Sequence, residues 1–485
     1  MLQTLKNAWN TKDIRSKIIF TLLILLLYRV GTVIPVPFVE ANNFAQNFSG
    51  TILDYMNTLS GGSLGTATLF ALGVSPYINA SIIIQLLAVV FPKLGELAKN
   101  DKKKMNFITR IVTVALAIVT AIGYYFLLKN SDMLSNIATA SDNEKTYWLF
   151  GIAIVCCYVA GATLIMWLAE RINERGIGNG ISLILFANII SSGPSFAYQL
   201  GSLVISTYKY ATLDYVNYWW LYAIVSTLFA LALIALILAF TVFVIWITGS
   251  ERRIPVQYAK KVVGRKMYGG QSSHLPIKLN MTGVMPVIFA SSIVSLIPTI
   301  LAICGVTSST KGFWGSLSKL LASDGIIYPL SLLVLIVAFS YFYTQITFDP
   351  IDVANNLKKQ GGAIPGIRQG RPTSDYIRKI LNKITLAGAA FLAIVAVLPV
   401  IAGPHLIHHI LEWLLRGGVD FEYAASLGTW YETYLSSSIT SSVSSLTSIF
   451  TFGGTTLLIV VGVAVETYRE LEAQLTMRNY KGFLN

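Results

Sequence analysis

Long apolar runs separated by short polar stretches dominate this chain of 485 residues. Ten of the runs have about the length that a helix needs to cross a bilayer core, roughly 20 residues. They cover approximately residues 18–36, 75–92, 106–128, 147–168, 181–204, 217–248, 283–305, 326–348, 384–403 and 451–468. The pattern predicts an all-α membrane protein with ten transmembrane helices, of which the long segment 217–248 tilts or extends beyond the bilayer.

One stretch departs from this pattern. It runs from Gly61 to Pro92 and reads GGSLGTATLFALGVSPYINASIIIQLLAVVFP. The part from Leu64 to Leu72 is apolar but too short to span a membrane, and Gly73 and Pro76 interrupt the chain after it. A broken half-helix is tolerated at membrane depth only where protein surrounds it or where it lines a cavity. The stretch therefore predicts a short re-entrant helix inside the bundle.

Composition supports a membrane protein, and the distribution of charge predicts its orientation in the membrane. Hydrophobic residues make up 54% of the chain and charged residues only 12%, with a mean hydropathy of +0.64, whereas ordinary soluble proteins have about 25% charged residues. The net charge is +13. Lys and Arg gather at the N-terminus, in the loops after the second, fourth, sixth and eighth spans, and in the tail, which predicts cytosolic termini. Arg29 lies inside the first span, where we expect it to snorkel or to pair with a carbonyl.

Two loops carry much of this basic charge, at 249–280 and 349–383. In the first, Val256–Tyr258 and Lys266–Tyr268 are predicted strands around a turn at Gly264. The basic residues that the two loops display are Lys260, Lys261, Arg265, Lys266, Lys358, Lys359, Arg368 and Arg371. They reflect either topology and solubility alone or a cytosolic docking surface for an anionic partner such as ribosomal RNA or an acidic protein.

The remaining segments suggest supporting roles. Residues 1–16 predict an amphipathic helix on the membrane surface, and 300–328 predicts a short helix. The external segment 405–449 begins with His405, His408 and His409, for which an interfacial helix is favoured over a metal site because no carboxylate or Cys stands at ligand spacing. The chain has no motif of a phosphate-binding loop, zinc protease or α/β-hydrolase. These patterns predict no enzyme activity, no metal and no cofactor.

Several blocks of the sequence resemble the SecY family, the large subunit of the bacterial protein-export channel. Besides 61–87, they are MWLAERINERGIGNGISLILFA (166–187), the basic loop 251–293, DPIDVANNLKKQGGAIPGIRQG (349–370), FGGTTLLIVV (452–461) and LEAQLTMRNYKGF (471–483). They follow the family's order and spacing. The external insertion 405–449 is longer than the resemblance leads us to expect, and Gln369 replaces a proline, which we expect to loosen the tip of its loop.

The resemblance implies two pseudo-symmetric five-helix halves, 17–204 and 205–470, around a central hourglass pore, followed by the tail 471–485. It places an apolar pore ring at Val74, Ile78, Ile181, Leu185, Ile288 and Ile459, where Val74 and Leu185 replace isoleucine. It places a plug helix at Gly61, Gly62, Ser63, Leu64, Gly65, Thr66, Ala67, Thr68, Leu69, Phe70, Ala71 and Leu72. Asn79 and Gln85 are candidates for a lateral gate toward lipid, although ordinary helix contacts explain them almost equally well.

The same resemblance implies a function and partners. The chain would be a passive channel for unfolded secretory polypeptides in the bacterial plasma membrane, driven by the SecA ATPase or the ribosome. SecE and SecG would be its companion subunits, and signal peptides and nascent chains its substrates. The alternatives are a secondary transporter of small solutes, which broken helices also suit, and an accessory channel for a few substrates. The lack of mid-span carboxylates and the two basic loops disfavour the transporter.

Overall fold

The computed structural model describes residues 2–40, 52–131, 133–134, 144–194, 197–198, 201, 219–258, 261–263, 266–268, 272–303, 312–320, 327–402 and 436–481. The helices are α1 (Leu2–Asn10), α2 (Lys12–Gly31), α3 (Ile52–Leu59), α4 (Ser75–Val90), α5 (Pro92–Asn100), α6 (Lys102–Asn130), α8 (Glu144–Arg175), α9 (Gly180–Ser191), α11 (Trp219–Gly249), α12 (Met285–Ile303), α13 (Phe313–Leu320), α14 (Ile327–Thr347), α15 (Pro350–Lys359), α16 (Arg371–Ala402) and α19 (Ser436–Lys481). The strands are β1 (Glu251–Tyr258), β2 (Lys261–Val263), β3 (Lys266–Tyr268), β4 (Ser272–Lys278) and β5 (Gly362–Ala363).

Every predicted apolar run overlaps a helix, although α9 covers only the first part of its run. Among the described residues, four helices are long and apolar enough to cross a membrane, namely α6, α8, α14 continued by α15, and α16. The pair α4 and α5 forms one further candidate, bent by 118°. The bend lies at Phe91, whose backbone is extended, immediately before Pro92. The chain is therefore a multi-pass membrane protein.

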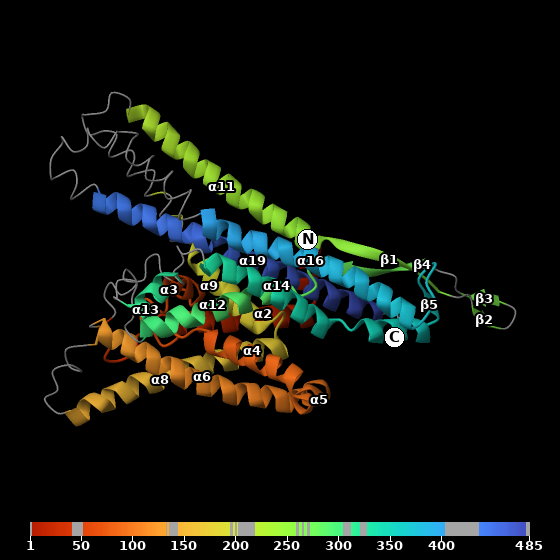
Figure 1. The fold of residues 1–485 in the computed structure, drawn as a ribbon, viewed down its shortest axis with the longest axis horizontal. Coiled ribbons are helices and arrows are strands. Elements are labelled where there is room, and N and C mark those ends of the chain that lie inside the picture. Colours follow the sequence, from red (N-terminus) through yellow and green to blue (C-terminus); the bar gives the residue numbers. More distant parts are fainter. Residues whose placement is uncertain are drawn as a thin grey trace.

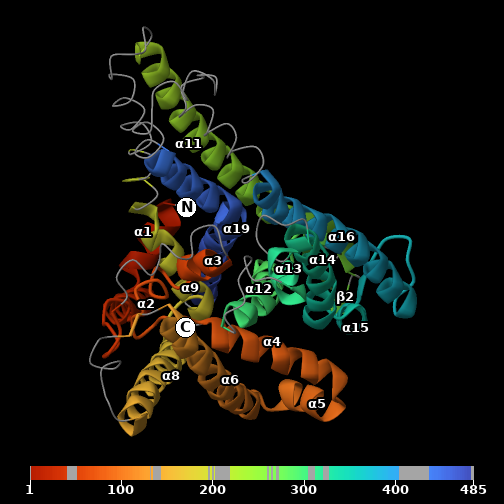
Figure 2. The same ribbon diagram turned by 60° about the vertical axis from the view of Figure 1, so that its left-hand side comes forward.

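The helices form two groups that meet along a central boundary. In one group α4 packs on α6, α6 on α8, and α8 on α2 and α9. In the other, α14 packs on α12 and α16, and α16 packs on α19. The groups touch where α9 meets α19 and where α4 meets α12 (Figure 2). One large apolar cluster runs through this boundary and includes Ile78, Leu185, Ile288 and Ile459.

The turn between α8 and α9 shows how the ERGIGNGIS motif fixes a helix pair. Asn179 caps α9 by accepting a hydrogen bond from the amide of Ile181, which satisfies a donor that a helix start leaves free. Gly178 has a φ of +83°. A Cβ on Gly180 would lie 2.1 Å from the carbonyl oxygen of Ala169, so only glycine permits this close approach of the two backbones.

The N-terminal segment differs from its prediction. Instead of one amphipathic helix over residues 1–16, α1 ends at Asn10 and α2 begins at Lys12, because Thr11 between them is extended. Ala8 of α1 packs with Ile14 of α2 and with Leu471 of α19 in a small separate core. Helix α1 thus packs against the C-terminal part of α19.

The strands form at one end of the molecule, where β2 and β3 project beyond the helices (Figure 1). The predicted strand at Lys266–Tyr268 is confirmed, but its partner is β2, while β1 pairs with β4 in a separate antiparallel ladder. The short helix expected within 300–328 is α13, and it is confirmed. The three histidines at 405, 408 and 409, and the external segment as far as residue 435, lie outside the described residues.

Candidate pore and docking surface

The stretch Gly61–Leu72, hereafter the turn segment, lies inside the bundle but is not the predicted helix. The helix is α3, which ends at Leu59, and the turn segment after it is a series of turns. Gly61 and Gly62 have φ values of +70° and +87°, and Ala67 has +47°. These left-handed conformations interrupt a helix. The prediction of a helix over Leu64–Leu72 was wrong, because Ala67 inside this range has a left-handed backbone and two left-handed glycines precede it.

Two buried tyrosines hold the turn segment by its backbone. The hydroxyl of Tyr124 on α6 donates a hydrogen bond to the carbonyl oxygen of Leu64. The hydroxyl of Tyr158 on α8 donates a 3.2 Å hydrogen bond to the carbonyl oxygen of Ala67. The two rings pack edge to face, with centroids 5.0 Å apart. Because buried carbonyls without a partner are costly, these hydroxyls stabilise the turn segment in its present position.

Close packing against α8 and α2 also holds the turn segment. A Cβ on Gly161 of α8 would lie 2.0 Å from the carbonyl oxygen of Leu69. The ring of Phe70 stacks on that of Tyr28 of α2 at 5.3 Å, in a space that a Cβ on Gly31 would fill. The amide of Leu69 also donates to the carbonyl oxygen of Ile34 at 2.9 Å. The turn segment is thus fitted against α2, α6 and α8.

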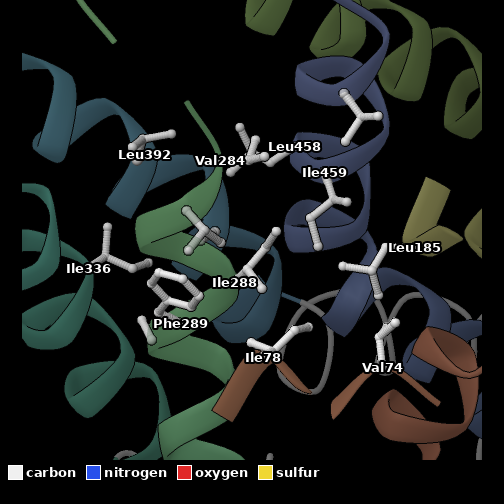
Figure 3. Close-up of a cluster of buried hydrophobic side chains, with 14 of the residues drawn as sticks. Val74, Ile78, Leu185, Val284, Ile288, Phe289, Ile336, Leu392, Leu458 and Ile459 are labelled. Carbon is white, nitrogen blue, oxygen red and sulfur yellow. The ribbon is translucent and has the colours of Figure 1, made fainter. Parts of the chain in front are cut away.

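The six predicted ring residues lie on helices α4, α9, α12 and α19, except Val74, which is the residue immediately before α4. Figure 3 shows five of them gathered where α4, α9, α12 and α19 meet. These five line a single cavity: Val74, Ile78, Leu185, Ile288 and Ile459. The sixth, Ile181, is half-buried and packs against the same apolar cluster without lining that cavity. Its spacing of four residues from Leu185 puts both on one face of α9.

The turn segment forms the other wall of this cavity. Leu64, Ala71 and Leu72 line it, together with Leu59 and Ser60 just before the segment. The cavity therefore lies between the aliphatic ring residues and the turn segment, and residues of α6, among them Thr120 and Leu127, complete its lining. Such a surface offers weak, sequence-independent contact to a passing chain and dewets when it is empty.

A seam between α4, α12 and α14 belongs to the same apolar cluster as the ring residues Ile78 and Ile288. Here Gln85 of α4 accepts a 2.6 Å hydrogen bond from the hydroxyl of Tyr343 on α14. The ring of Phe289 on α12 lies 5.0 Å from that of Tyr343. The Oδ1 atom of Asn79 is buried and has no hydrogen-bond partner among the described residues. The seam therefore consists of aromatic packing and one hydrogen bond across it.

The two basic loops, 249–280 and 349–383, are joined to each other by a strand pairing and a shared apolar core. Strand β5 of the second loop pairs with β1 of the first, with Tyr258 opposite Gly362. Beneath this sheet, Ile254 and Ile277 share an apolar core with Leu357 of α15 and Ile377 of α16. This pairing was not predictable from the sequence, because β5 has only two residues. The second loop is consequently packed against strands β1 and β4 of the first loop.

The structure places four of the predicted basic docking residues. Lys358 and Lys359 are exposed at the end of α15, Arg368 is exposed on the following turn, and Arg371 is exposed at the start of α16. For Lys261 and Lys266 only the backbone is described, and Lys260 and Arg265 lie outside the described residues.

Gln369 has the opposite effect from the one expected. Its Nε2 donates a 3.1 Å hydrogen bond to the carbonyl oxygen of Gly362, and the hydroxyl of Thr373 donates to the carbonyl oxygen of Arg368 at 2.7 Å. The first bond ties the loop that carries Arg368 to strand β5, and the second ties it to the start of α16. Gln369 therefore fastens this loop instead of loosening it.

Sequence reasoning missed three side chains at these sites. Tyr343 belongs to no motif, and only its contact with Gln85 reveals it. Arg110 of α6 forms a two-pronged ion pair with Glu170 of α8, at 2.8 and 2.7 Å, and so joins two helices of one group. At the base of the first basic loop, burial and the nearby guanidinium of Arg469 lower the pKa of Lys278.

Two solved structures share this fold. One is described as showing that the plug domain of SecY stabilises the closed state of the translocation channel and maintains a membrane seal; it has a TM-score of 0.54 at 17% identity. The other is Sec61 in the canine ribosome-channel complex from the endoplasmic reticulum, with a TM-score of 0.53 at 16% identity. Each comparison covers 95% of this chain and 92% of the other. The chain therefore has the fold of these two structures.

Sequence relatives define the family. The SecY family model matches residues 68–420. The protein translocase subunit SecY of Streptomyces galbus is 38% identical over 496 residues, and that of Mycobacterium bovis is 37% identical over 502 residues. Both comparisons cover 100% of each chain. The chain belongs to the SecY family, as its motifs predicted.

Proposed function

We propose that this chain is the central subunit of a channel that moves unfolded secretory polypeptides across the bacterial plasma membrane. The observation that carries the proposal is the cavity that the aliphatic ring and the turn segment line together. Ten spans in two halves, 17–204 and 205–470, would surround this pore, with both termini in the cytosol. The turn segment, together with α3, would be the plug on the external side.

The ring suits a substrate of arbitrary sequence. An extended polypeptide presents every kind of side chain, and a pore lined with fixed polar groups would hold some of them and stall. Aliphatic side chains bind each weakly enough to release it, and in the empty pore they exclude water and ions. The bulky apolar residues Val74 and Leu185 serve this purpose in place of isoleucine.

The seam between α4, α12 and α14 is the proposed lateral gate. Opening it would part the aromatic contacts and break the hydrogen bond between Gln85 and Tyr343. A hydrogen bond between membrane helices contributes about 0.6–2 kcal/mol, which is small enough to break when an apolar segment enters. Asn79 lies on the same helix as Gln85, with an oxygen available for a new partner. Transmembrane segments would leave through this seam into lipid.

The body formed by the two basic loops is the proposed docking surface for SecA and for ribosomal RNA. Its exposed cations Lys358, Lys359, Arg368 and Arg371 lie at the end of α15, on the turn after it and at the start of α16. Both helices share an apolar core with the sheet, so a partner would push against a well-packed platform. The channel itself carries out no bond chemistry in this proposal. SecA or the elongating ribosome supplies the energy, and SecE and SecG complete the complex.

Cross-linking during transport tests this function. Ile459→Cys is made in a background without the native cysteines, and the protein is reconstituted with SecE, SecG and SecA in vesicles. A secretory precursor with one cysteine is stalled in transit by a folded C-terminal domain. The proposal expects a disulfide between the precursor and position 459 that requires ATP.

The matched control is Leu398→Cys on the outer face of α16, where the side chain is 54% exposed. It should give no cross-link. Equal cross-linking at both positions, or no cross-link at position 459 while transport proceeds, would contradict a path through the ring. Accumulation of a small solute without any precursor transport would favour the transporter alternative.

A further inference from the structure

A buried polar knot lies where α3 joins the turn segment. At its centre is Asn188 of α9, which has no exposed surface. Its Nδ2 donates two hydrogen bonds, at 2.9 Å to the hydroxyl of Tyr28 on α2 and at 2.7 Å to the carbonyl oxygen of Leu59 at the end of α3. One amide group therefore links α2, α3 and α9.

Arg29 completes the knot from the side of α2. Its Nη2 donates to the carbonyl oxygen of Ala187, the residue before Asn188. A Cβ on Gly61 would lie 2.9 Å from Nη1 of Arg29 and 3.0 Å from Oδ1 of Asn188. Gly61 thus passes between the two side chains with its φ at +70°, a position that only glycine fills without strain.

We propose that Asn188, supported by Arg29, is a positioning residue that latches the hinge between α3 and the turn segment in the closed channel. The inference rests on the proposed function of this region as the plug. Further along the turn segment, Tyr124 and Tyr158 fix the backbone at Leu64 and Ala67. The hydrogen bond of Asn188 to the carbonyl oxygen of Leu59 is the corresponding attachment just before the turn segment begins. It holds the backbone of the hinge, not a side chain.

The place of Asn188 on α9 also links the latch to the ring. Ile181, Leu185 and Asn188 are spaced i, i+4 and i+7, and residues at this spacing share one face of a helix. A polypeptide that spreads the ring displaces the face of α9 that carries Asn188. The two hydrogen bonds to Tyr28 and Leu59 then lengthen, and the hinge is released. Occupancy of the ring and release of the plug are thereby coupled through one rigid helix.

The test measures ion conductance of the chain with SecE in planar bilayers. Asn188→Leu keeps the size of the side chain and removes both donated bonds. Because each net hydrogen bond corresponds to roughly a five- to tenfold change in an equilibrium, the fraction of time spent open should rise about tenfold or more. Tyr28→Phe removes one of the two bonds with little risk to folding and should give a smaller rise.

Two controls separate a latch from a general loss of stability. Ser182→Ala on the same helix removes a buried hydroxyl that has no hydrogen-bond partner among the described residues, and it should leave the channel silent. In a chain lacking Gly61–Leu72, Asn188→Leu should add no further conductance, because it acts through the missing segment.

The outcomes are distinct from those that test the plug itself. If the deletion conducts while Asn188→Leu and Tyr28→Phe both stay silent, the latch is refuted and the plug stands. If Asn188→Leu adds conductance even in the deletion, the residue acts on the bundle as a whole and the latch is again refuted. If the deletion itself is silent, the assignment of the plug fails.

Discussion

A single methyl group at Gly161 should displace the turn segment. The Cβ of Gly161→Ala would lie 2.0 Å from the carbonyl oxygen of Leu69, whereas the closest ordinary contact between carbon and oxygen is about 3.3 Å. The two backbones must therefore separate by roughly 1.3 Å. The same face of α8 carries Tyr158, whose hydrogen bond to Ala67 is already 3.2 Å long, so this displacement breaks it.

The expected cost is that of overpacking a well-filled core, about 1–3 kcal/mol. Because the strain falls on the contact between α8 and the turn segment, most of it is relieved when the segment leaves. Gly161→Ala should therefore dissipate an imposed membrane potential in vesicles faster than the parent protein, at equal protein content. A voltage-sensitive dye reports the rate.

Gly151→Ala is the matched control on the same helix. Its Cβ would lie 3.0 Å from the ring of Tyr125. Because this side chain can turn away, the variant should hold the membrane potential. If Gly161→Ala held the potential as well as the parent and unfolded at the same temperature, the methyl group would not displace the turn segment.

Three further perturbations follow from the seam and the docking surface. Tyr343→Phe removes the hydrogen bond to Gln85 and should let less hydrophobic test segments integrate into lipid, whereas Tyr341→Phe, two residues earlier, should not; equal integration thresholds for both would contradict the gate. Gln369→Leu loses a hydrogen bond of about 1 kcal/mol and should speed proteolysis of the loop beside Gly362, and an unchanged rate would argue against fastening. Arg368→Glu should weaken SecA-driven export while complex assembly stays intact, and an equal loss of assembly would count against a docking role.

Much of this architecture was predictable from the sequence because its signals are local. Apolar runs mark the helices, and the ring follows from the motif resemblance, whose positions on α4, α9, α12 and α19 do converge. The turn after α8 is likewise predictable, because Asn179 caps α9 and Gly180 allows the close approach of the two backbones.

What could not be predicted depends on contacts between distant segments. The pairing of Tyr258 with Gly362 joins strands that lie about a hundred residues apart, and one of them is only two residues long. The effect of Gln369 depends on a carbonyl seven residues away that only this pairing presents. The turn segment was predicted as a helix because apolarity favours that structure, but glycines with positive φ and buried tyrosines from other helices determine its path.

The most direct measurement is the single-channel conductance of this chain with SecE in a planar bilayer, recorded for the intact protein and for one lacking Gly61–Leu72. The intact protein should be silent, because the turn segment closes the cavity below the aliphatic ring. The deletion should flicker between open and closed levels, since the ring alone excludes ions incompletely. A silent deletion, or a steady current through the intact protein, would contradict a pore sealed by the ring and the turn segment together.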